Sequence, residues 1–494
     1  MRTLGFDNDK YLKLQSQNIR DRISGIGGKL YMEFGGKLFD DYHAARVLPG
    51  FQPDSKIRML MEMKDEAEVV IAISANAIEQ NKRRGDSGIT YDQEVMRLID
   101  AFSEIGLYVG SVVVTMFAGQ SAALAFEKKL TALGIKVYRH YQISDYPSNV
   151  SHIISEDGFG KNDWVETSRS LVVVTAPGPG SGKMEVCLSQ IYNDHKRGIN
   201  AGYAKFETFP IWNIPLKHPV NLAYEAATAD LNDVNMIDPY HLAAYGETTV
   251  NYNRDIEIFP VLQTMFTRIF GESPYKSPTD MGVNMAGYCI DDDEAVTDAS
   301  KQEILRRYYA ALCNVRRGLA EQSEVMKLEL IMNTLGITES IRPVVDAALE
   351  KAEVTGAPAV AVELADGRII TGKTSNLLGA SSAVLLNLLK ALAGIDDKYD
   401  LISPSIIEPI QKLKVNHMGN HNPRLHMDEI LIALSVCAQT DTRAKRALDQ
   451  LPRLRDCEAH STVILSEVDS SVFKKLGINL TCEPRYQTKR LYHR

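Results

Sequence analysis

The sequence predicts an α/β protein whose N-terminal part is a doubly wound, mostly parallel, three-layer sheet. Short β-rich runs alternate with amphipathic helical patterns from about residue 29 to residue 209, and several of these runs are apolar throughout. Both observations are typical of buried parallel strands joined by helices. We expect an α/β phosphate-binding domain over residues 1–214, a mainly helical region over 215–338, and a smaller C-terminal α/β domain over 339–494.

The predicted elements of the first domain follow from local hydrophobic patterns. The expected strands are Lys29–Phe34, Glu68–Ser74, Gly110–Met116, Ile135–His140, Leu171–Thr175 and Ala201–Phe206. The expected helices, which carry apolar residues at helical spacing, are Ser55–Glu66, Tyr91–Ile105, Ser121–Leu133 and Met184–Asn193. Strands that alternate with helices in this way form parallel sheets, whose ligands bind off the carboxyl ends of the strands.

The remaining elements are fewer and more helical. The expected helices are Val220–Leu231, Asp255–Phe270, Asp298–Leu335 and Leu377–Ala393, and the acidic run 291–294 marks a solvated loop or a helix start. Residues 357–372 predict a hairpin that turns at Ala365-Asp-Gly367, and Ser461–Leu465 predicts a strand. The small, apolar residues of Leu377–Ala393 would suit the interface of a homo-oligomer, and a buried core helix explains them equally well.

Composition excludes several classes of protein. A net charge of −8 over 494 residues argues against a nucleic-acid scaffold, which needs a basic surface to neutralise phosphates. The N-terminus lacks the apolar core of a signal peptide, and no stretch reaches the roughly 18 apolar residues of a membrane span, so we expect a cytoplasmic protein with no membrane partner. The 6 cysteines form no C-x-x-C pair, which indicates neither a zinc ribbon nor a disulfide framework.

The most informative segment joins an apolar strand to a helix through a glycine-rich turn. It reads Leu171-Val-Val-Val-Thr-Ala-Pro-Gly-Pro-Gly-Ser-Gly-Lys-Met184. Glycines let backbone N–H groups converge on an anion, a helix N-terminus adds positive potential, and a lysine supplies a point charge. The segment therefore predicts a phosphate or nucleotide site, with binding residues Gly178, Gly180, Ser181, Gly182 and Lys183.

This turn is an incomplete form of the phosphate loop G-x-x-x-x-G-K-[ST]. Pro177 stands where the first glycine belongs, and Met184 replaces the hydroxyl residue that would hold Mg²⁺. Phosphate binding is thus a better expectation than metal-assisted hydrolysis, although Ser181 or Thr175 could supply a substitute hydroxyl. The alternative is a purely structural turn, because strand-to-helix turns favour Gly and Pro without any ligand.

Other polar side chains are expected at the same edge of the sheet. Gln120 and Ser121 begin the helix after one strand and are candidate ligand-binding residues, although Ser is also an ordinary helix cap. Glu207 follows the strand after the glycine turn and could handle a proton or position a metal, with a solvated strand end as the alternative. We expect Lys183 to point into a cleft shared with the 118–121 turn and Glu207.

A second group of ionisable residues follows the strand Lys29–Phe34. It contains Asp40, Asp41, His43 and Arg46. A histidine near a carboxylate can titrate near neutral pH, which makes Asp41 and His43 candidates for general acid and base. The alternative is a helix whose first turn carries Asp because of the helix dipole, with the other side chains exposed.

Three histidines lie close together in the C-terminal region, namely His417, His421 and His426. Clustered histidines can bind zinc together with a carboxylate. Gly419 and Pro423, however, indicate a loop rather than a helix, and the H-E-x-x-H pattern is absent. We therefore predict a polar loop between domains or subunits and no metal site.

Four strings in the chain resemble a bacterial family. They are Lys37-Leu-Phe-Asp-Asp-Tyr-His-Ala-Ala-Arg-Val-Leu-Pro-Gly-Phe51, Val173-Val-Thr-Ala-Pro-Gly-Pro-Gly-Ser-Gly-Lys-Met184, Ser277-Pro-Thr-Asp-Met-Gly-Val-Asn284 and Cys457-Glu-Ala-His-Ser-Thr-Val-Ile-Leu465. They are similar to the uncharacterised protein family 0371, also known as domain of unknown function 1846, over essentially the whole chain. The resemblance implies a bacterial cytoplasmic protein with an N-terminal and a smaller C-terminal domain, and it transfers no catalytic residues.

Three functions remain open from the sequence. The first is an enzyme of phosphoryl-transfer or ligase type, in which Lys183 neutralises charge and Glu207 or the pair Asp41 and His43 moves protons. The second is a non-catalytic sensor of a phosphate group or nucleotide, and the third is a metal-dependent hydrolase that uses the C-terminal histidines. The expected partner is a phosphorylated small molecule, a nucleotide is the candidate cofactor, and no nucleic-acid partner is expected.

Overall fold

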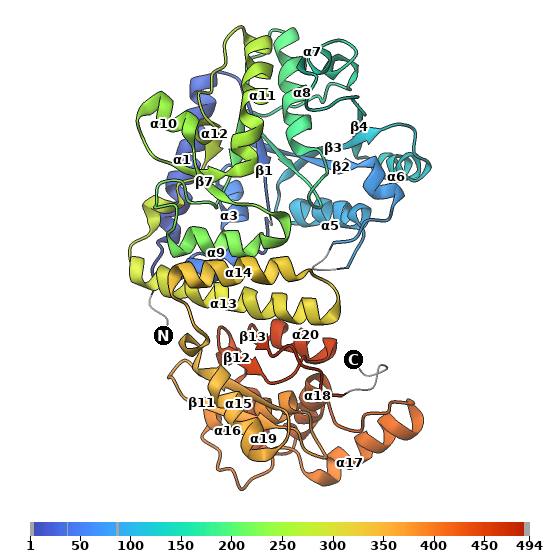
Figure 1. The fold of residues 1–494 in the computed structure, drawn as a ribbon. Helices are drawn as coiled ribbons and strands as arrows, with labels where there is room; N and C mark the ends of the chain where they lie inside the picture. Colours follow the sequence, from blue (N-terminus) through green and yellow to red (C-terminus); the bar gives the residue numbers. More distant parts are fainter. Residues whose placement is uncertain (1–3, 37, 85–87, 489–494) are drawn as a thin grey trace. The chain divides into compact units, whose positions relative to one another are not determined.

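The computed structural model describes residues 4–36, 38–84 and 88–488, which divide into two compact units (Figure 1). The N-terminal unit comprises residues 4–225 and 232–300, and the C-terminal unit comprises residues 226–231 and those from 301 onward. Each unit has its own sheet. The predicted α/β class, with a parallel sheet first and a smaller mixed sheet after it, is confirmed.

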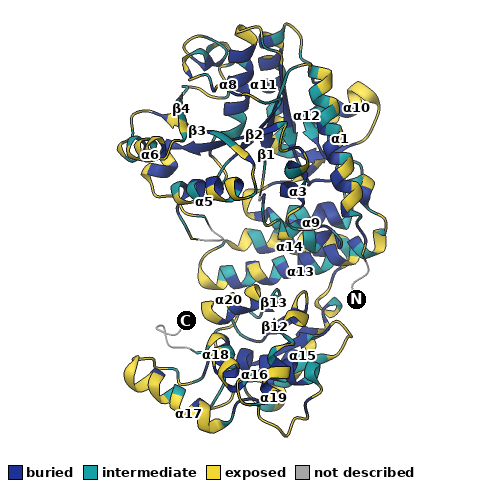
Figure 2. Ribbon diagram, turned by 180° about the vertical axis from the view of Figure 1, so that it is seen from behind, coloured by how far each residue is buried: buried dark blue, intermediate teal, exposed yellow. Residues whose placement is uncertain are grey.

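The N-terminal unit is built on a parallel sheet with the strand order β4-β3-β2-β5-β1-β6-β9. Its strands are β1 (Lys29–Phe34), β2 (Ala67–Ser74), β3 (Tyr108–Phe117), β4 (Lys136–Tyr141), β5 (Leu171–Thr175), β6 (Ala201–Phe206) and β9 (Gly282–Val283). The first six coincide closely with the predicted strands. Continuous apolar runs such as Leu171–Thr175 allow these strands to be buried on both faces, as Figure 2 shows.

The sheet is doubly wound. From β2 the chain proceeds to β3 and β4 at one side, whereas from β5 it passes over β1 to β6 at the other side. The connections that leave β2 and β5 therefore diverge at the carboxyl ends of these neighbouring strands. Ligands of doubly wound sheets bind at such a point, and the glycine-rich turn starts there because it follows β5.

Helices cover both faces of this sheet. Apolar side chains of α8 (Lys183–Lys196) and α11 (Asn253–Phe270) pack against alternate residues of the strands, such as Tyr31 and Val172, in one core. The helices α3 (Ser55–Glu62) and α5 (Tyr91–Glu104) lie on the opposite face (Figure 1). The other elements are α1 (Asn8–Ile26), α2 (Tyr42–Val47), α4 (Ala75–Glu79), α6 (Ser121–Ala132), α7 (Val150–Ile153), α9 (Pro219–Ala227), α10 (Pro239–Tyr245), α12 (Pro278–Met281) and the antiparallel pair β7 (Asn235–Ile237) and β8 (Val250–Tyr252).

The C-terminal unit has a mixed sheet with the strand order β11-β10-β12-β13. Its strands are β10 (Ala359–Glu363), β11 (Ile369–Lys373), β12 (Glu458–Ser461) and β13 (Asn479–Cys482). The hairpin of β10 and β11 turns where predicted, with Gly367 in the left-handed region at φ 81°. The helices are α13 (Asp293–Arg317), whose residues 293–300 belong to the N-terminal unit, α14 (Gln322–Leu335), α15 (Pro343–Thr355), α16 (Ala380–Ala393), α17 (Pro404–Lys412), α18 (Met427–Cys437), α19 (Thr442–Leu448) and α20 (Glu467–Lys475).

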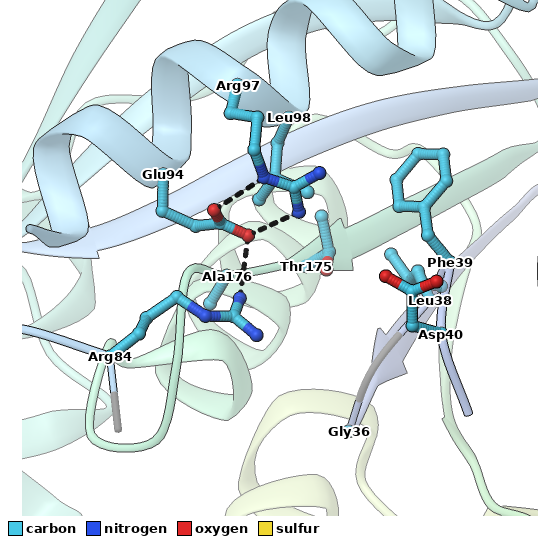
Figure 3. A pocket seen from close by; sticks show the side chains of 10 residues that line it. All are labelled: Gly36, Leu38, Phe39, Asp40, Arg84, Glu94, Arg97, Leu98, Thr175 and Ala176. Atoms are coloured by element: carbon cyan, nitrogen blue, oxygen red, sulfur yellow. Dashed lines mark hydrogen bonds and ion pairs between the residues drawn. The ribbon is translucent and has the colours of Figure 1, made fainter. Parts of the chain in front are cut away.

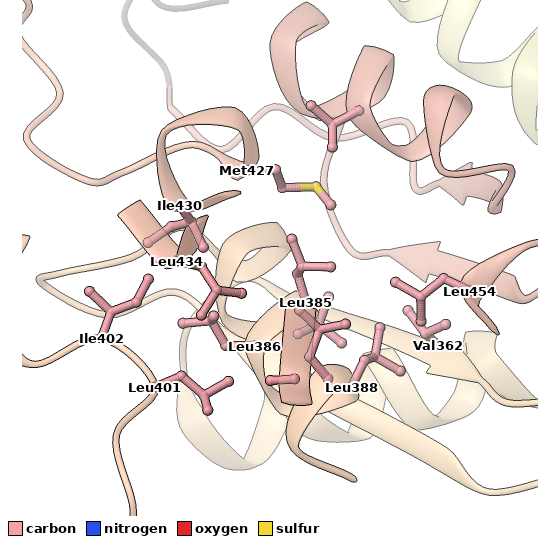
Figure 4. Close-up of a cluster of buried hydrophobic side chains, with 14 of the residues drawn as sticks. Val362, Leu385, Leu386, Leu388, Leu401, Ile402, Met427, Ile430, Leu434 and Leu454 are labelled. Carbon is pink, nitrogen blue, oxygen red and sulfur yellow. The ribbon is translucent and has the colours of Figure 1, made fainter. Parts of the chain in front are cut away.

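Helix α16 is the centre of the C-terminal core. Its residues Leu385 and Leu388 are buried against Val362 of β10 and Leu434 of α18 (Figure 4). The two interpretations of the predicted helix Leu377–Ala393 are thereby separated. Its small, apolar residues serve the core of its own unit, so the composition of this helix gives no support to a subunit interface.

Two predicted elements are wrong. The helix expected over Asp298–Leu335 is two helices, because Gly318 adopts φ 75° and ends α13 before α14 begins. The strand expected at Ser461–Leu465 ends where it was expected to begin, since β12 is Glu458–Ser461. The residues after Ser461 have high β propensity, but the ladder with the partner strand β10 stops at the pair Val360 and Ser461.

Candidate functional site

The glycine-rich turn joins the carboxyl end of β5 to the N-terminus of α8, and two of its glycines are required by close packing. Gly182 has φ 83°, and a Cβ there would lie 3.0 Å from Oγ1 of Thr115. A Cβ on Gly178 would lie 2.3 Å from the hydroxyl oxygen of Tyr91. Part of the glycine content therefore has a structural cause, as the alternative interpretation held.

Side chains of neighbouring segments hold the carbonyl groups of the turn. Thr115 Oγ1 donates a hydrogen bond of 2.9 Å to the carbonyl of Ser181, and Ser181 Oγ donates one of 2.9 Å to the carbonyl of Gly178. From the segment after α4, Lys82 Nζ and Arg84 Nη1 donate to the carbonyls of Pro179 and Pro177, at 3.3 and 3.1 Å. The carbonyl groups and the Ser181 hydroxyl are thus used within the protein.

The N–H groups of the same segment are not used in this way. Within the described part of the chain, no acceptor receives a hydrogen bond from the backbone N–H groups of residues Gly180–Glu185. Every helix leaves its first four N–H groups without intrahelical partners, and a capping side chain commonly accepts from them. The N-cap of α8 is Gly182, which has no side chain. The helix start therefore presents donors together with the positive end of the helix dipole.

Lys183 is the first residue of α8. Its Nζ lies 3.7 Å from Oε1 of Glu33 in β1, and its side chain is 16% exposed. Charge-assisted hydrogen bonds between ammonium and carboxylate groups are about 2.7–2.9 Å long. The longer separation leaves the ammonium group able to turn toward a ligand, while Glu33 also accepts a hydrogen bond of 2.9 Å from the hydroxyl of Tyr203.

Glu207 lies at the end of β6 in a second group of charges. Lys205 Nζ is 2.8 Å from Glu207 Oε1 and also contacts the carboxylate of Asp255. Burial raises the pKa of Glu207 to about 7, although Lys205 acts in the opposite direction. Burial lowers the pKa of Lys205, but Asp255 and Glu207 outweigh it and raise that pKa. Glu207 is therefore a carboxyl group that titrates near neutral pH.

The two groups of charges lie side by side on neighbouring strands. Glu33 of β1 and Lys205 of β6 are partners in the register of the parallel pair. Charges thus alternate in sign from Lys183 through Glu33 and Lys205 to Glu207 at the carboxyl ends of these strands. The structure brings Lys183 and Glu207 to the same edge of the sheet, with the side chains of Glu33 and Lys205 between them.

Gln120 and Ser121 are engaged elsewhere. Gln120 Nε2 donates to Oδ1 of Asn76 at 2.9 Å, and Ser121 Oγ donates to Oε1 of Glu79 at 3.2 Å. These bonds tie the start of α6 to α4. From β3, it is Thr115 that reaches the glycine-rich turn, and Met116 beside it has φ 52°, which is unusual for a residue that is neither Gly, Asn nor Asp.

The candidates after β1 have structural partners. Asp41 is the N-cap of α2, and its carboxylate lies 2.9 Å from the ammonium group of the buried Lys56. Burial raises the pKa of Asp41, but Lys56 outweighs this effect and lowers the pKa. The ring of His43 packs edge-on against Phe209 and Tyr224, with centroids 5.4 and 5.6 Å away. Asp41 thus pairs with a lysine and His43 with aromatic rings.

The C-terminal histidines belong to different local structures. His417 ends a π-helical turn, Leu413–His417, and His426 is the N-cap of α18. His426 Nδ1 lies 3.2 Å from Oδ2 of Asp469, and this hydrogen bond raises the pKa of His426. Among the residues that the structure describes, no three His, Cys, Asp or Glu side chains are grouped so that they could hold a metal ion.

Several residues of this edge were missed in the sequence. Glu33 and Asp255 complete the charge series, and Arg84 and Arg97 form ion pairs with the buried Glu94 beside the glycine-rich turn (Figure 3). Glu33 could have been found in the sequence, because it is a glutamate within the apolar strand β1. The arginines carry no such signal, because Arg is common on exposed helices and loops.

The fold and this edge define a two-unit α/β protein with a glycine-rich strand-to-helix turn at the centre of a doubly wound sheet. The chain belongs to the DUF1846 family. The model of domain of unknown function DUF1846, N-terminal, matches residues 4–336, and the C-terminal model matches residues 340–492. The predicted family resemblance is therefore confirmed.

Relatives of the chain match over its full length. It is 58% identical over 494 residues to the UPF0371 protein of Streptococcus pyogenes serotype M28 (strain MGAS6180), with 100% of each chain covered. The UPF0371 protein of Streptococcus thermophilus (strain ATCC BAA-491 / LMD-9) is also 58% identical, again with 100% of each chain covered. None of the helices in the described ranges has the length and apolar character needed to cross a bilayer.

Proposed function

We propose that the protein binds the phosphate group of a small molecule or nucleotide at the N-terminus of α8. The observation that carries this proposal is the run of backbone N–H groups over Gly180–Glu185, for which the described residues supply no acceptor. A phosphate oxygen would accept from several of these groups at once. If a typical capping residue stood in place of Gly182, its side chain would accept hydrogen bonds from these N–H groups.

Lys183 supports the proposal through its charge. Its ammonium group stands at the first position of α8 and is held only loosely by Glu33, at 3.7 Å. On phosphate binding it would neutralise part of the added negative charge. Met184 stands where a phosphate loop has its magnesium-binding hydroxyl, and the Ser181 hydroxyl donates to the carbonyl of Gly178. Binding should therefore depend only weakly on Mg²⁺.

Glu207 favours an enzyme over a sensor. Burial raises its pKa to about 7, a value suited to a group that takes and returns protons near neutral pH. It lies at the same sheet edge as the turn, with Glu33 and Lys205 between it and Lys183. The reaction class proposed is phosphoryl transfer or ligation, with Glu207 in the proton-transfer role.

A nucleotide and phosphometabolite panel tests the proposal. Thermal shift and calorimetric titration would be run on the full chain with and without Mg²⁺, followed by a turnover assay on each compound that binds. We expect at least one phosphate compound to bind while its dephosphorylated form does not. Failure of every phosphate compound to bind would leave the turn as a structural connection, and binding without turnover would assign a sensor.

A further inference from the structure

A strip of charged side chains, here called the polar strip, continues from the start of α8 across two neighbouring strands. The strand order places β5, β1 and β6 side by side, so the turn after β5 and Glu207 after β6 are two strand spacings apart. Neighbouring strands lie about 4.8 Å apart, which makes this separation roughly 10 Å. A phosphate group bound at the start of α8 is therefore separated from Glu207 by the length of several carbon atoms.

The polar strip consists of Glu33 on β1, Lys205 on β6, Asp255 in the first turn of α11, and Glu207. Their side chains and that of Lys183 are between 10 and 22% exposed. Each charged group is thus partly buried and still reached by solvent. A polar atom of a ligand can replace the water on these groups.

The carboxylates of the polar strip have acceptor sites that the protein does not use. An ionised carboxylate offers about four lone-pair sites. In the described part of the chain, Glu33 accepts one hydrogen bond, from the hydroxyl of Tyr203, and lies 3.7 Å from Lys183 Nζ. Glu207 Oε1 lies 2.8 Å from Lys205 Nζ, and no described residue donates a hydrogen bond of normal geometry to it. Groups of a ligand that donate hydrogen bonds would find acceptors here.

The charges along the polar strip decide which kind of donor fits. Lys183 and Lys205 would repel an ammonium group of the ligand, and the carboxylates beside them would repel a second anionic group. A hydroxyl group carries no charge, donates to a carboxylate and accepts from an ammonium group. A nucleobase would instead set an apolar ring face over these ions and remove their water without replacing its hydrogen bonds.

We propose that the ligand is a phosphate ester of a polyhydroxylated carbon chain, that is, a sugar phosphate or sugar-alcohol phosphate. Its phosphate group lies at the start of α8, and its hydroxyl groups donate to Glu33 and Glu207 and accept from Lys205. Tyr203 holds Glu33 and Asp255 holds Lys205, so these groups are oriented before a ligand binds. This inference rests on the phosphate site proposed above and names the substrate class of that site.

Titration calorimetry of the full chain with three matched phosphate esters tests the inference. Ribitol 5-phosphate and pentyl phosphate have the same five-carbon chain, but only the first carries further hydroxyl groups. The third compound, 5-aminopentyl phosphate, places an ammonium group at the far end of this chain. We expect ribitol 5-phosphate to bind at least about tenfold more tightly than either of the others, because each hydrogen bond gained adds a few-fold in affinity.

Variants of the full chain locate the hydroxyl contacts. Glu207→Ala should lower the affinity ratio of ribitol 5-phosphate to pentyl phosphate by about threefold or more and leave the binding of pentyl phosphate unchanged. Lys183→Ala should weaken both compounds by the same factor. Glu257→Ala changes an exposed carboxylate two positions after Asp255 and should alter neither affinity. Circular dichroism checks that each variant is folded, and the comparison of compounds on the parent chain needs no variant.

The outcomes separate this inference from the phosphate site itself. Equal affinities of the parent for ribitol 5-phosphate and pentyl phosphate would overturn the inference and leave the phosphate site in place. Tighter binding of 5-aminopentyl phosphate, or an unchanged affinity ratio in Glu207→Ala, would overturn it as well. If none of the three compounds binds, the inference is wrong, and failure of the whole nucleotide and phosphometabolite panel would remove the phosphate site too.

Discussion

The glycine-rich turn before α8 and the histidine-containing loop before α18 both resemble ligand sites in the sequence, yet they differ in how their polar groups are used. At α8 the cap is Gly182, and the described residues provide no acceptor for the N–H groups that follow. At α18 the cap is His426, whose N–H donates to Glu429 at 2.7 Å and whose ring meets Asp469. Polar groups that already have partners have little left to offer a ligand.

Asp469 explains why the polar groups of the histidine-containing loop already have partners. One carboxylate oxygen accepts from the N–H of Met427 at 2.9 Å, and the other accepts from Ser466 Oγ at 3.1 Å and faces His426 Nδ1. This single buried side chain joins the starts of α18 and α20. The comparison predicts that changes near α18 alter stability, whereas changes near α8 alter ligand binding.

The largest expected effect is on stability at α18. Asp469→Ala should lower the local free energy of unfolding by about 2–3 kcal/mol, because the buried N–H of Met427 loses its acceptor. Hydrogen exchange of the α18 and α20 peptides, read by mass spectrometry, measures this loss. The control is Asp441→Ala, which removes a partly exposed N-cap from α19 and should lower stability by about 1 kcal/mol. Equal losses in the two variants would contradict the comparison.

At α8 the expected effect is on binding. Lys183→Ala should weaken the affinity for a phosphate compound roughly tenfold, about 1.4 kcal/mol, and change stability by less than about 0.5 kcal/mol. Titration calorimetry and urea unfolding measure the two quantities. Lys196→Ala, at the other end of the same helix, serves as the control and should leave affinity unchanged. An unchanged affinity in Lys183→Ala would show that the lysine serves its contact with Glu33 and not a ligand.

A smaller effect is expected from pH at α18. The hydrogen bond to Asp469 raises the pKa of His426, against the lowering effect of burial. The folded state therefore holds the proton more tightly than the unfolded state does. The stabilisation is fully present below the ordinary histidine pKa of about 6.5 and is lost as pH rises through the raised value.

Unfolding of the parent and His426→Gln at several pH values measures this contribution. We expect the free energy of unfolding of the parent to exceed that of the variant by up to about 1 kcal/mol at low pH. This difference should shrink at high pH. His417→Gln serves as the control, because His417 is exposed at the end of a π-helical turn. A difference that grows with pH would show instead that the folded state holds the proton of His426 less tightly than the unfolded state does.

The smallest expected effect concerns metal binding by the histidine loop. Since His426 is engaged by Asp469, the histidine loop should retain no stoichiometric zinc after dialysis, as elemental analysis would measure. One equivalent of zinc that disappears in a variant with His417→Ala and His421→Ala would show that this loop is a metal site after all. A strong Mg²⁺ requirement for phosphate binding at α8 would instead indicate that Thr175 or Glu207 supplies a metal ligand.

The sequence predicted the glycine-rich turn and the start of α8 better than the residues that surround them. The turn, its position after β5 and the helix start at Lys183 follow from residues that are adjacent in the chain. Glu33, Arg84 and Thr115 contact this segment from three other parts of the chain. No spacing in the sequence relates these three residues to the turn, so the sequence could show only the local surroundings of each one.

Local patterns determined the strands, the helices and the class of fold, because periods of 2.0 and 3.6 residues are set by neighbouring positions. The tertiary structure decided which polar groups would be satisfied. His426 and Asp469 are 43 positions apart, and Thr115 and Ser181 are 66 apart. Such pairs depend on strand order and helix packing, which arise from burial of the whole chain. For this reason the sequence could name the histidine loop and the glycine-rich turn as candidate regions and favour the turn, but it could not give the partners that their polar groups find in the folded chain.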